Sequence, residues 1–507
     1  MKKELFLDWK RSLENWWLNK MADNLDLVSK LSEEERLLQK HSLDCISPDD
    51  AKYGKASTKL KKYLSAAAEW KTCAYVQKVL LETRVEFGQA EQTNLEEVNV
   101  ALEKVDPLNM ALLEGEVTRH DQLAVIEEIG RFVSPETKAL LHPGTTSYDI
   151  LDTARSYLFK EAWNNVIRPE VVSTLEKLCD LSERSMDILQ TGRTHLQDTS
   201  PVLFGSMIAG YAARITDRLE KCDASFEDLR GKVSGMVGTG ASIDMVIGEG
   251  KSIEFEISVL KKLGLKPDYT ATQVVQKERV ADVGHGITTL MHVLGDFAND
   301  IRILYSSAIN EVTSRDNVER LGGSSADATK NNPINYENIV GTSSVVESGM
   351  RVLYGIIQTD LQRDLRGSKQ ARYQPQAMMA ETYESFLRMN KALGQLSINE
   401  DVIAKNLERV RKNPSEAMTA ILRGEKWIHS EYGVGHDFVK EMGKRAKREG
   451  RPLLKECFED SEFRMLYSRQ LTENKRAILE GELENYVGSS RTRAQQNLKY
   501  VKSVIKE

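Results

Sequence analysis

The sequence ERVADVGHGITTLMHVLGDFANDIRILYSSAI, residues 278–309, carries the clearest periodic signal in the chain. Its larger apolar residues recur in alternating steps of three and four: Val280, Val283, Ile287, Leu290, Leu294, Phe297, Ile301 and Leu304. Such a heptad stripe predicts one long helix that packs nearly parallel to its neighbours in a bundle. Similar helical patterning runs through residues about 153–190, 201–230 and 335–362, and the breaks between these segments are short and polar.

The length of 507 residues suggests two or three domains, because single cores stop growing well below this size. Only eleven residues are proline, which favours long uninterrupted helices. Breaks fall near Ser47–Pro48 and Asp106–Pro107, and beyond about residue 395 the segments become shorter. We predict an all-α protein with three helical domains: an N-terminal domain over 1–142 with an extension over 1–45, a central long-helix bundle over 143–395, and a C-terminal domain over 396–507.

The helical pattern and the composition limit the partners and cofactors that we expect for this protein. A lone layer of helices cannot bury both faces, so we expect the bundle to assemble with copies of itself. The net charge of −6 is small for this length, so neither nucleic acid nor a membrane is an expected partner. The five cysteines are scattered and odd in number, which argues against a disulfide framework or a zinc site and favours a reducing cytoplasm. We expect no metal or other cofactor.

The segment GGSSADATKNNP, residues 322–333, has the most unusual composition in the chain. Glycine and asparagine cost backbone entropy and bury little apolar area, so this is no core segment. A loop that closes over an anion would use these residues: the serines offer a nucleophile or base, and Lys330 with Asn332 can hold a carboxylate. Taken alone, an ordinary polar surface loop fits the segment equally well.

Three further polar islands interrupt the helical pattern. His142–Thr153 places hydroxyls at a helix start, which suits a carboxylate or phosphate but also a simple N-cap. Gly192–Asp198 holds His195 at a helix break, as a candidate general acid or base or as a structural histidine. Ser234–Ala241 is rich in glycine, but no strand pattern precedes it, which weakens its interpretation as a dinucleotide loop.

Together these segments resemble the shared motifs of the fumarase/aspartase superfamily. Gly323–Pro333 is similar to its signature loop, Gly-Ser-Ser-x-Met-Pro-x-Lys-x-Asn-Pro. His142–Thr153 and Thr194–Gln197 are similar to its two other shared regions and occur in the same order. Three motifs on one helical chain with little proline make the likeness specific.

Within the superfamily, further segments resemble the adenylosuccinate lyase family. Ser47–Gly54 is similar to its motif Ser-Pro-x-Asp-Gly-Arg-Tyr-Gly, and Thr118–Asp121 is similar to Thr-x-His-Asp. Thr272–Val274 with Lys277–Arg279 resembles a Thr-Gln-Val…Arg-Asp-Arg element. Arg363–Arg372 is similar to the segment that holds the nucleotide phosphate in that family.

The resemblance covers roughly residues 46–400 and implies an activity. The implied activity is a β-elimination in purine biosynthesis that releases fumarate from a small-molecule succinyl-nitrogen substrate. The expected substrate is adenylosuccinate, with its imidazole carboxamide precursor as an additional one. The resemblance also implies a cytoplasmic homotetramer in which three subunits build each active site.

The resemblance assigns roles to individual residues. Ser324 would be the general base, and His195 would be the general acid on the leaving nitrogen. His120 would bind the substrate phosphate or orient His195. The residues that would stabilise the carboxylate are Lys330, Asn332, Thr146 and Ser147. The remaining substrate-binding residues that it implies are Thr194, Asp121, Lys52, Tyr53, Arg363, Ser368, Arg372, Gln273, Ser325 and, as a secondary polar contact, His142.

Two departures from the family patterns bear on the substrate. Asp327–Ala328 stand where the signature has Met-Pro, which loosens the loop and adds a carboxylate that could pair with Lys330 or repel a dianion. Lys52 stands where arginine is usual, which exchanges a bidentate fork for a point charge. Two alternatives stay open: a related lyase that eliminates another group from a substituted succinate, and an inactive structural homo-oligomer. The retained Ser324 and His195 count against the second.

Overall fold

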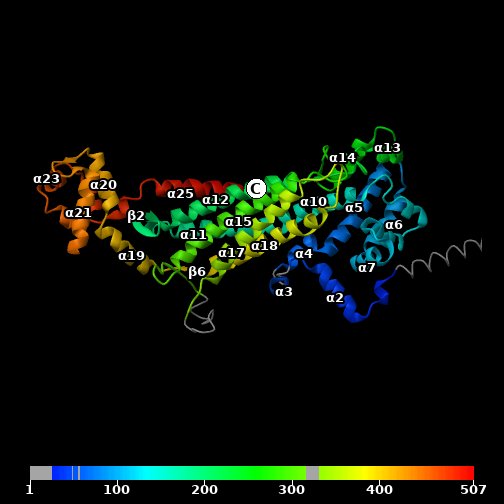
Figure 1. The fold of residues 1–507 in the computed structure, drawn as a ribbon, viewed down its shortest axis with the longest axis horizontal. Helices are drawn as coiled ribbons and strands as arrows, with labels where there is room; N and C mark the ends of the chain where they lie inside the picture. Colours follow the sequence, from blue (N-terminus) through cyan, green and yellow to red (C-terminus); the bar gives the residue numbers. More distant parts are fainter. Residues whose placement is uncertain (1–25, 48–49, 55–56, 316–329, 507) are drawn as a thin grey trace, which may run out of the picture. The chain divides into compact units, whose positions relative to one another are not determined.

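Helices make up most of the described chain in the computed structural model (Figure 1), which describes residues 26–47, 50–54, 57–315 and 330–506. The strands of that part of the chain are short and pair two by two. The prediction of an all-α protein is therefore confirmed. Among the described residues, no helix combines the length and the apolar character needed to cross a membrane.

The stripe at residues 278–309 forms the long helix α15 (Glu278–Leu304). Its apolar positions are almost completely buried: Val283, Ile287, Leu290, Leu294, Phe297 and Ile301 are at most 2% exposed. The helix ends at Leu304, and the turn that follows leads to Asn310, which has a positive φ of 53°. The other long helices are α10 (Ser147–Ala162), α11 (Arg168–Arg184), α12 (Phe204–Glu227), α17 (Ile334–Gly355) and α18 (Ser368–Gln395).

The chain clusters into two compact units, each assembled from three segments. The first contains Met1–Glu170, Lys221–Met291 and Ser344–Ser385, and the second contains Val171–Glu220, His292–Ser343 and Phe386–Glu507. The division into 1–142, 143–395 and 396–507 that the sequence suggests stays a prediction.

In the first unit, several helices start at a residue whose side chain caps them. The expected break at Asp106–Pro107 is the start of α7, where Asp106 Oδ1 accepts the N–H of Leu108 at 2.9 Å and proline occupies the first turn. The remaining elements of this unit, among which α5 is a further long helix, are η1 (Val28–Lys30), α2 (Glu33–Asp44), α3 (Asp50–Tyr53), α4 (Thr58–Leu64), α5 (Ala66–Glu86), α6 (Gln92–Leu102), α7 (Pro107–Leu113), η2 (Glu114–Thr118), α8 (Asp121–Gly130), α9 (Pro135–Ala139), η3 (Trp163–Ile167), β3 (Arg230–Gly231), α13 (Ala241–Ile247), α14 (Ser252–Lys262) and β4 (Lys266–Pro267).

A buried ion pair ties the glycine-rich stretch Ser234–Ala241 to α10. The Asp149 carboxylate accepts a short hydrogen bond from Lys232 Nζ, and both side chains are 0% exposed. It also accepts the backbone N–H groups of Ser234 at 3.1 Å and Gly235 at 3.1 Å. Gly235 has a φ of +78°, which only glycine adopts without strain. The stretch is therefore a structural connection to the start of α10, where part of the candidate site lies.

The second unit contains an element that the helical pattern did not predict. Strands β1 (Leu189–Thr194) and β2 (Gln197–Leu203) form an antiparallel hairpin where helix was expected up to residue 190 and from residue 201. The register shifts between Thr191 and Arg193, and a Cβ on Gly192 would lie 2.5 Å from the carbonyl oxygen of Ser200. Glycine therefore permits the close approach of the two strands.

The end of the chain forms a cluster of shorter helices within the second unit, as the change in sequence character after residue 395 predicts. Its core holds Phe438 and Phe463, whose rings are stacked with centroids 5.7 Å apart. The remaining elements of the second unit are β5 (Val312–Ser314), β6 (Leu396–Ile398), α19 (Glu400–Lys412), α20 (Ser415–Gly424), β7 (Ile428–His429), β8 (Gly433–Val434), α21 (Gly435–Glu449), α22 (Leu453–Cys457), α23 (Ser461–Arg469), α24 (Glu473–Leu479), η4 (Leu483–Asn485) and α25 (Ser490–Val504).

Candidate active site

The N-terminus of α10 brings predicted site residues together. Thr146 is its N-cap, and the Thr146 N–H donates to Asp149 Oδ2 at 2.7 Å in a capping box. Ser147 follows as the first helical residue. A helix N-terminus presents N–H groups and the positive end of the helix dipole, so this position favours an anion.

His120 lies against Ser147. Its Nδ1 accepts the N–H of Leu123 at 3.4 Å as the N-cap of α8, so in the neutral ring the proton sits on Nε2. Nε2 lies 3.0 Å from Ser147 Oγ and therefore donates to it. The carboxylate of Asp121 is 3.5 Å from Nδ1 and can pair with the ring when a second proton binds.

His142 is held as a neutral ring in the turn before α10. Its Nδ1 lies 3.0 Å from Nε2 of Gln77, an amide nitrogen that can only donate. Burial, together with the positive charges of His120 and Arg84, lowers the pKa of His142 to about 4. The proton of the neutral ring is therefore on Nε2, and this residue can donate a hydrogen bond but cannot act as a base at neutral pH.

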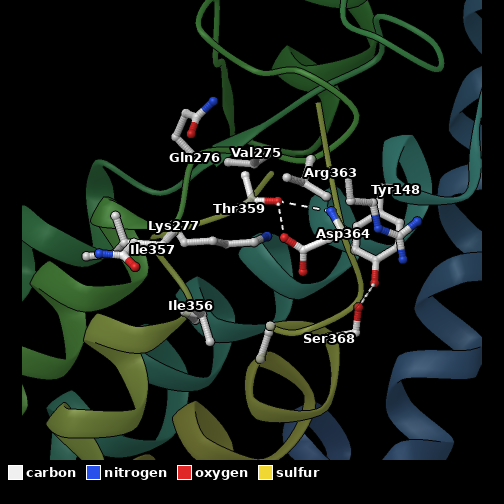
Figure 2. A pocket seen from close by; sticks show the side chains of 14 residues that line it. Tyr148, Val275, Gln276, Lys277, Ile356, Ile357, Thr359, Arg363, Asp364 and Ser368 are labelled. Carbon is white, nitrogen blue, oxygen red and sulfur yellow. Dashed lines mark hydrogen bonds between the residues drawn. The ribbon is translucent and has the colours of Figure 1, made fainter. Parts of the chain in front are cut away.

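A pocket in the first unit is lined by Arg363 and Ser368, two residues that the family resemblance assigns to the substrate phosphate. Tyr148 of α10 also lines it (Figure 2). The guanidinium carbon of Arg363 lies 3.8 Å from the centre of the Tyr148 ring, and its Nη1 donates to Gln273 Oε1 at 2.9 Å. Tyr148 Oη lies 3.2 Å from Oγ of Ser368, the first residue of α18. Arg363 Nε is buried and has no hydrogen-bond partner among the described residues.

A second pocket contains the predicted residues Asp121 and Arg372, together with Glu69 and Trp70 of α5. Two of its amide side chains are buried: Gln122 is 0% exposed and Gln376 is 7% exposed. Neither amide atom of Gln122, nor Oε1 of Gln376, has a hydrogen-bond partner among the described residues. Because buried polar groups are normally satisfied, the pocket is suited to a polar ligand.

In sequence, the chain is similar to known lyases. A family model described as Lyase matches residues 48–347. The chain belongs to the fumarase/aspartase superfamily. An adenylosuccinate lyase from Pyrococcus abyssi is 31% identical over 77% of this chain and 84% of its own, and one from Archaeoglobus fulgidus is 26% identical over 91% of this chain and all of its own.

Solved structures of the superfamily share the fold. A fumarate lyase from Mesorhizobium superposes with a TM-score of 0.72 at 20% identity and covers 87% of this chain and 97% of its own. The 3-carboxy-cis,cis-muconate lactonizing enzyme from Pseudomonas putida superposes with a TM-score of 0.75 at 16% identity and covers 88% of this chain and 97% of its own. At these identities the likeness establishes the architecture and not the substrate.

The superfamily region around His195 lies at the tip of the β1–β2 hairpin, in the second unit. His195 and Leu196 form its two-residue turn with φ values of 52° and 58°, and both are exposed. Such turns usually contain Asn-Gly, because other side chains are strained at positive φ. Arg193 anchors the hairpin through Nη2, which donates to the fully buried Glu311 at 2.6 Å. A strained histidine on an anchored hairpin is consistent with a functional role.

The remaining predicted residues occupy several places. Thr194 ends β1, and Lys330 and Asn332 precede α17, all three in the second unit. Lys52 lies exposed on α3, which ends at Tyr53. Ser324 and Ser325, the predicted base and its neighbour, lie outside the described residues, as do Asp327 and Ala328.

Sequence reasoning missed four residues around the site. Tyr148 stacks on Arg363, and its place directly after Ser147 was a signal that could have found it. Gln77, Arg84 and Lys232 gave no such signal, because single polar residues in helical or glycine-rich segments are usually solvent exposed. Each of the three is in fact at most 1% exposed.

Proposed function

We propose that this protein is an adenylosuccinate lyase that splits adenylosuccinate into AMP and fumarate. The observation that carries the proposal is the likeness to adenylosuccinate lyases, which extends over 91% of this chain for the relative from Archaeoglobus fulgidus. The two pockets of the first unit support it, because they contain the residues that the family resemblance assigns to the nucleotide end of the substrate.

The reaction requires a stabilised carbanion. A base removes a proton from the succinyl carbon next to a carboxylate, and the electron pair moves into that carboxylate to give a dianionic aci-form. The electrons then return, the carbon–nitrogen bond breaks, and the leaving nitrogen takes a proton. In the proposed assignment Ser324, as its oxyanion, takes the first proton and His195 supplies the second.

Stabilisation of the dianion is the largest part of the task. We assign it to the N-terminus of α10 with Thr146 and Ser147, together with Lys330 and Asn332. The hydrogen bond between His120 and Ser147, 3.0 Å long, supports the first assignment because it fixes the hydroxyl rotamer before substrate binds. His142 adds a neutral donor near the same helix start.

We assign the phosphate of the substrate to Arg363, Ser368 and Arg372, with Lys52 and Tyr53 as further contacts. Arg363 is already oriented by Gln273 and by the Tyr148 ring, so less side-chain entropy is lost when it binds an anion. The remaining members of the proposed binding set are Thr194, Asp121 and Ser325.

We further propose a cytoplasmic homotetramer with three helical domains per chain, in which neighbouring subunits complete each active site. The family resemblance and the length of the helices support this assembly. Light scattering on the purified protein should give a mass of about four chains.

Purified protein incubated with adenylosuccinate should release AMP and fumarate in equal amounts, both measured by chromatography. Ser324→Ala should lower the turnover number at least about 10²-fold, because the variant lacks the base. An inert wild-type protein would contradict the proposal. Fumarate released only from another substituted succinate, in a reaction that Ser324→Ala abolishes, would support the alternative lyase, for which Asp327 and Lys52 are the favouring observations.

Arg363→Met should raise KM for adenylosuccinate about 10–100-fold, because it removes a charge-assisted hydrogen bond worth about 1.5–3 kcal/mol. Succinyladenosine, which lacks the phosphate, should be converted by wild type and variant with equal KM. Arg366→Met is the matched control, since Arg366 lies on the same loop but pairs with Asp360 at 2.5 Å. An equal rise in KM for both substrates would show that Arg363 does not hold the phosphate.

A further inference from the structure

The turn that leads into α10, residues 140–146, depends on contacts with other parts of the first unit for its position. It connects α9 to α10 and contains two residues in the left-handed region, His142 with a φ of 70° and Gly144 with a φ of 74°. A residue other than glycine costs roughly 1–2 kcal/mol in that conformation. The local hydrogen bonds Thr145 N–H and Oγ1 to the His142 carbonyl, at 3.1 and 2.6 Å, close the turn but do not fix it against the rest of the unit.

Helix α5 supplies this support through Gln77 and Arg84. They lie seven residues apart, which is two helical turns, and so face the same side of the helix. Arg84 Nη1 donates to the Leu140 carbonyl at 2.8 Å, and Nη2 donates a short hydrogen bond to the Pro143 carbonyl. Gln77 donates to the His142 ring. These three bonds from one helix face hold the turn together with the hydrogen bond that Ser242 Oγ donates to the Gly144 carbonyl at 2.6 Å.

The charge of Arg84 has no counter-ion in the described chain. The side chain is 1% exposed, and among the described residues no carboxylate acts on its charge. Burial lowers its pKa to about 10, which leaves it charged at neutral pH. A buried charge without a partner is costly, and backbone carbonyls could be bound as well by a neutral amide. The choice of arginine therefore has a cost that an anionic ligand would remove.

We propose that Arg84 and Gln77 are positioning residues of the active site: they fix the turn that aligns Thr146 and Ser147, and the buried charge of Arg84 favours the dicarboxylate end of the substrate there. This inference rests on the proposed function for its substrate. It also explains why His142 is kept neutral, since the ring can then donate through Nε2 to the same anion.

The test compares Arg84→Met and Arg84→Lys with wild type in two assays. Turnover of adenylosuccinate should fall about 10²-fold in Arg84→Met, as expected for a displacement of about 1 Å in catalytic groups. Arg84→Lys keeps the charge and should recover part of this loss. Calorimetry should show that fumarate, the dicarboxylate product, binds at least about tenfold more weakly to Arg84→Met.

A nuclear magnetic resonance titration of His142 provides a readout that a loss of stability alone would not change. The charged and titratable groups that act on this ring are His120, Arg84 and Asp121. Removal of the guanidinium charge in Arg84→Met should raise the pKa of His142, whereas Arg84→Lys should leave it low. The control is Arg411→Met in the second unit, which removes an arginine that donates to the Gly481 carbonyl at 2.6 Å but also has a carboxylate partner, Glu484.

The outcomes separate this inference from the proposed function. A wild type that binds fumarate but does not convert adenylosuccinate would refute only the proposed function, and the binding assay would still test the role of Arg84. Equal fumarate affinity in wild type and Arg84→Met would overturn the inference, and so would a wild type that binds no fumarate.

Discussion

His195→Ala should lower the turnover number for adenylosuccinate by about 10²–10⁴-fold, the range typical of a lost general acid. The reason is that the leaving nitrogen must take a proton as the carbon–nitrogen bond breaks. KM should stay nearly unchanged. His195 is exposed at the tip of a hairpin whose turn it shares with Leu196, so the substitution creates no cavity in the core. Steady-state kinetics and far-ultraviolet circular dichroism of the variant would check both statements.

Two controls make this prediction specific. Leu196→Ala changes the other residue of the turn and should keep the turnover number within about threefold of wild type, since the side chain is 67% exposed and supplies no proton. We expect His195 and Ser324 to come from different subunits of the proposed tetramer, so a mixture of His195→Ala and Ser324→Ala subunits should regain part of the activity. Full activity of His195→Ala alone would show that another group protonates the leaving nitrogen.

The periodic apolar segments of the sequence correctly predicted a helical fold, and helix α15 shows why. Its stripe reflects burial along one helix face, and burial is the property that hydrophobic spacing encodes. The hairpin of His195 could not be predicted in this way. Its strands, LQTGRT and QDTSPVL, alternate poorly and contain glycine and proline, and they are stabilised by the buried Glu311, which receives bonds from Gln190 at 2.6 Å and from Arg193. That contact joins residues more than a hundred positions apart.

The residues of the candidate site likewise fall into those that the sequence could predict and those that it could not. Motif resemblance found the side chains expected to touch substrate, because those lie in short polar segments with recognisable spacing. The groups that hold them are different: Gln77, Arg84 and Lys232 are isolated polar residues, and only their burial shows their role. Their partners come from other parts of the chain, so no local pattern distinguishes them from exposed polar residues.

Lys232→Met should destabilise the protein by about 3–5 kcal/mol, the cost typical of breaking a buried ion pair and leaving one charge behind. Asp149 would remain fully buried with a negative charge and without its cationic partner. Urea denaturation should show a lower midpoint at an unchanged slope. The matched control is Lys262→Met in the same unit, whose ion pair with Glu86 is partly exposed and 2.5 Å long, and which should cost no more than about 1 kcal/mol.

A second substitution separates charge from hydrogen bonding in this pair. Asp149 accepts the N–H groups of Thr146, Ser234 and Gly235, so an apolar replacement would leave buried donors unsatisfied. The double variant Lys232→Met/Asp149→Asn would remove the unpaired charge and keep one accepting oxygen. Its new amide NH2 would face the N–H of either Thr146 or Ser234, so only part of the lost stability should return. If the double variant is as unstable as Lys232→Met, the ammonium group matters through its own bond to the Gly235 carbonyl at 3.0 Å and not through charge. In that case the glycine-rich stretch, and with it the start of α10, depends on Lys232 as a hydrogen-bond donor.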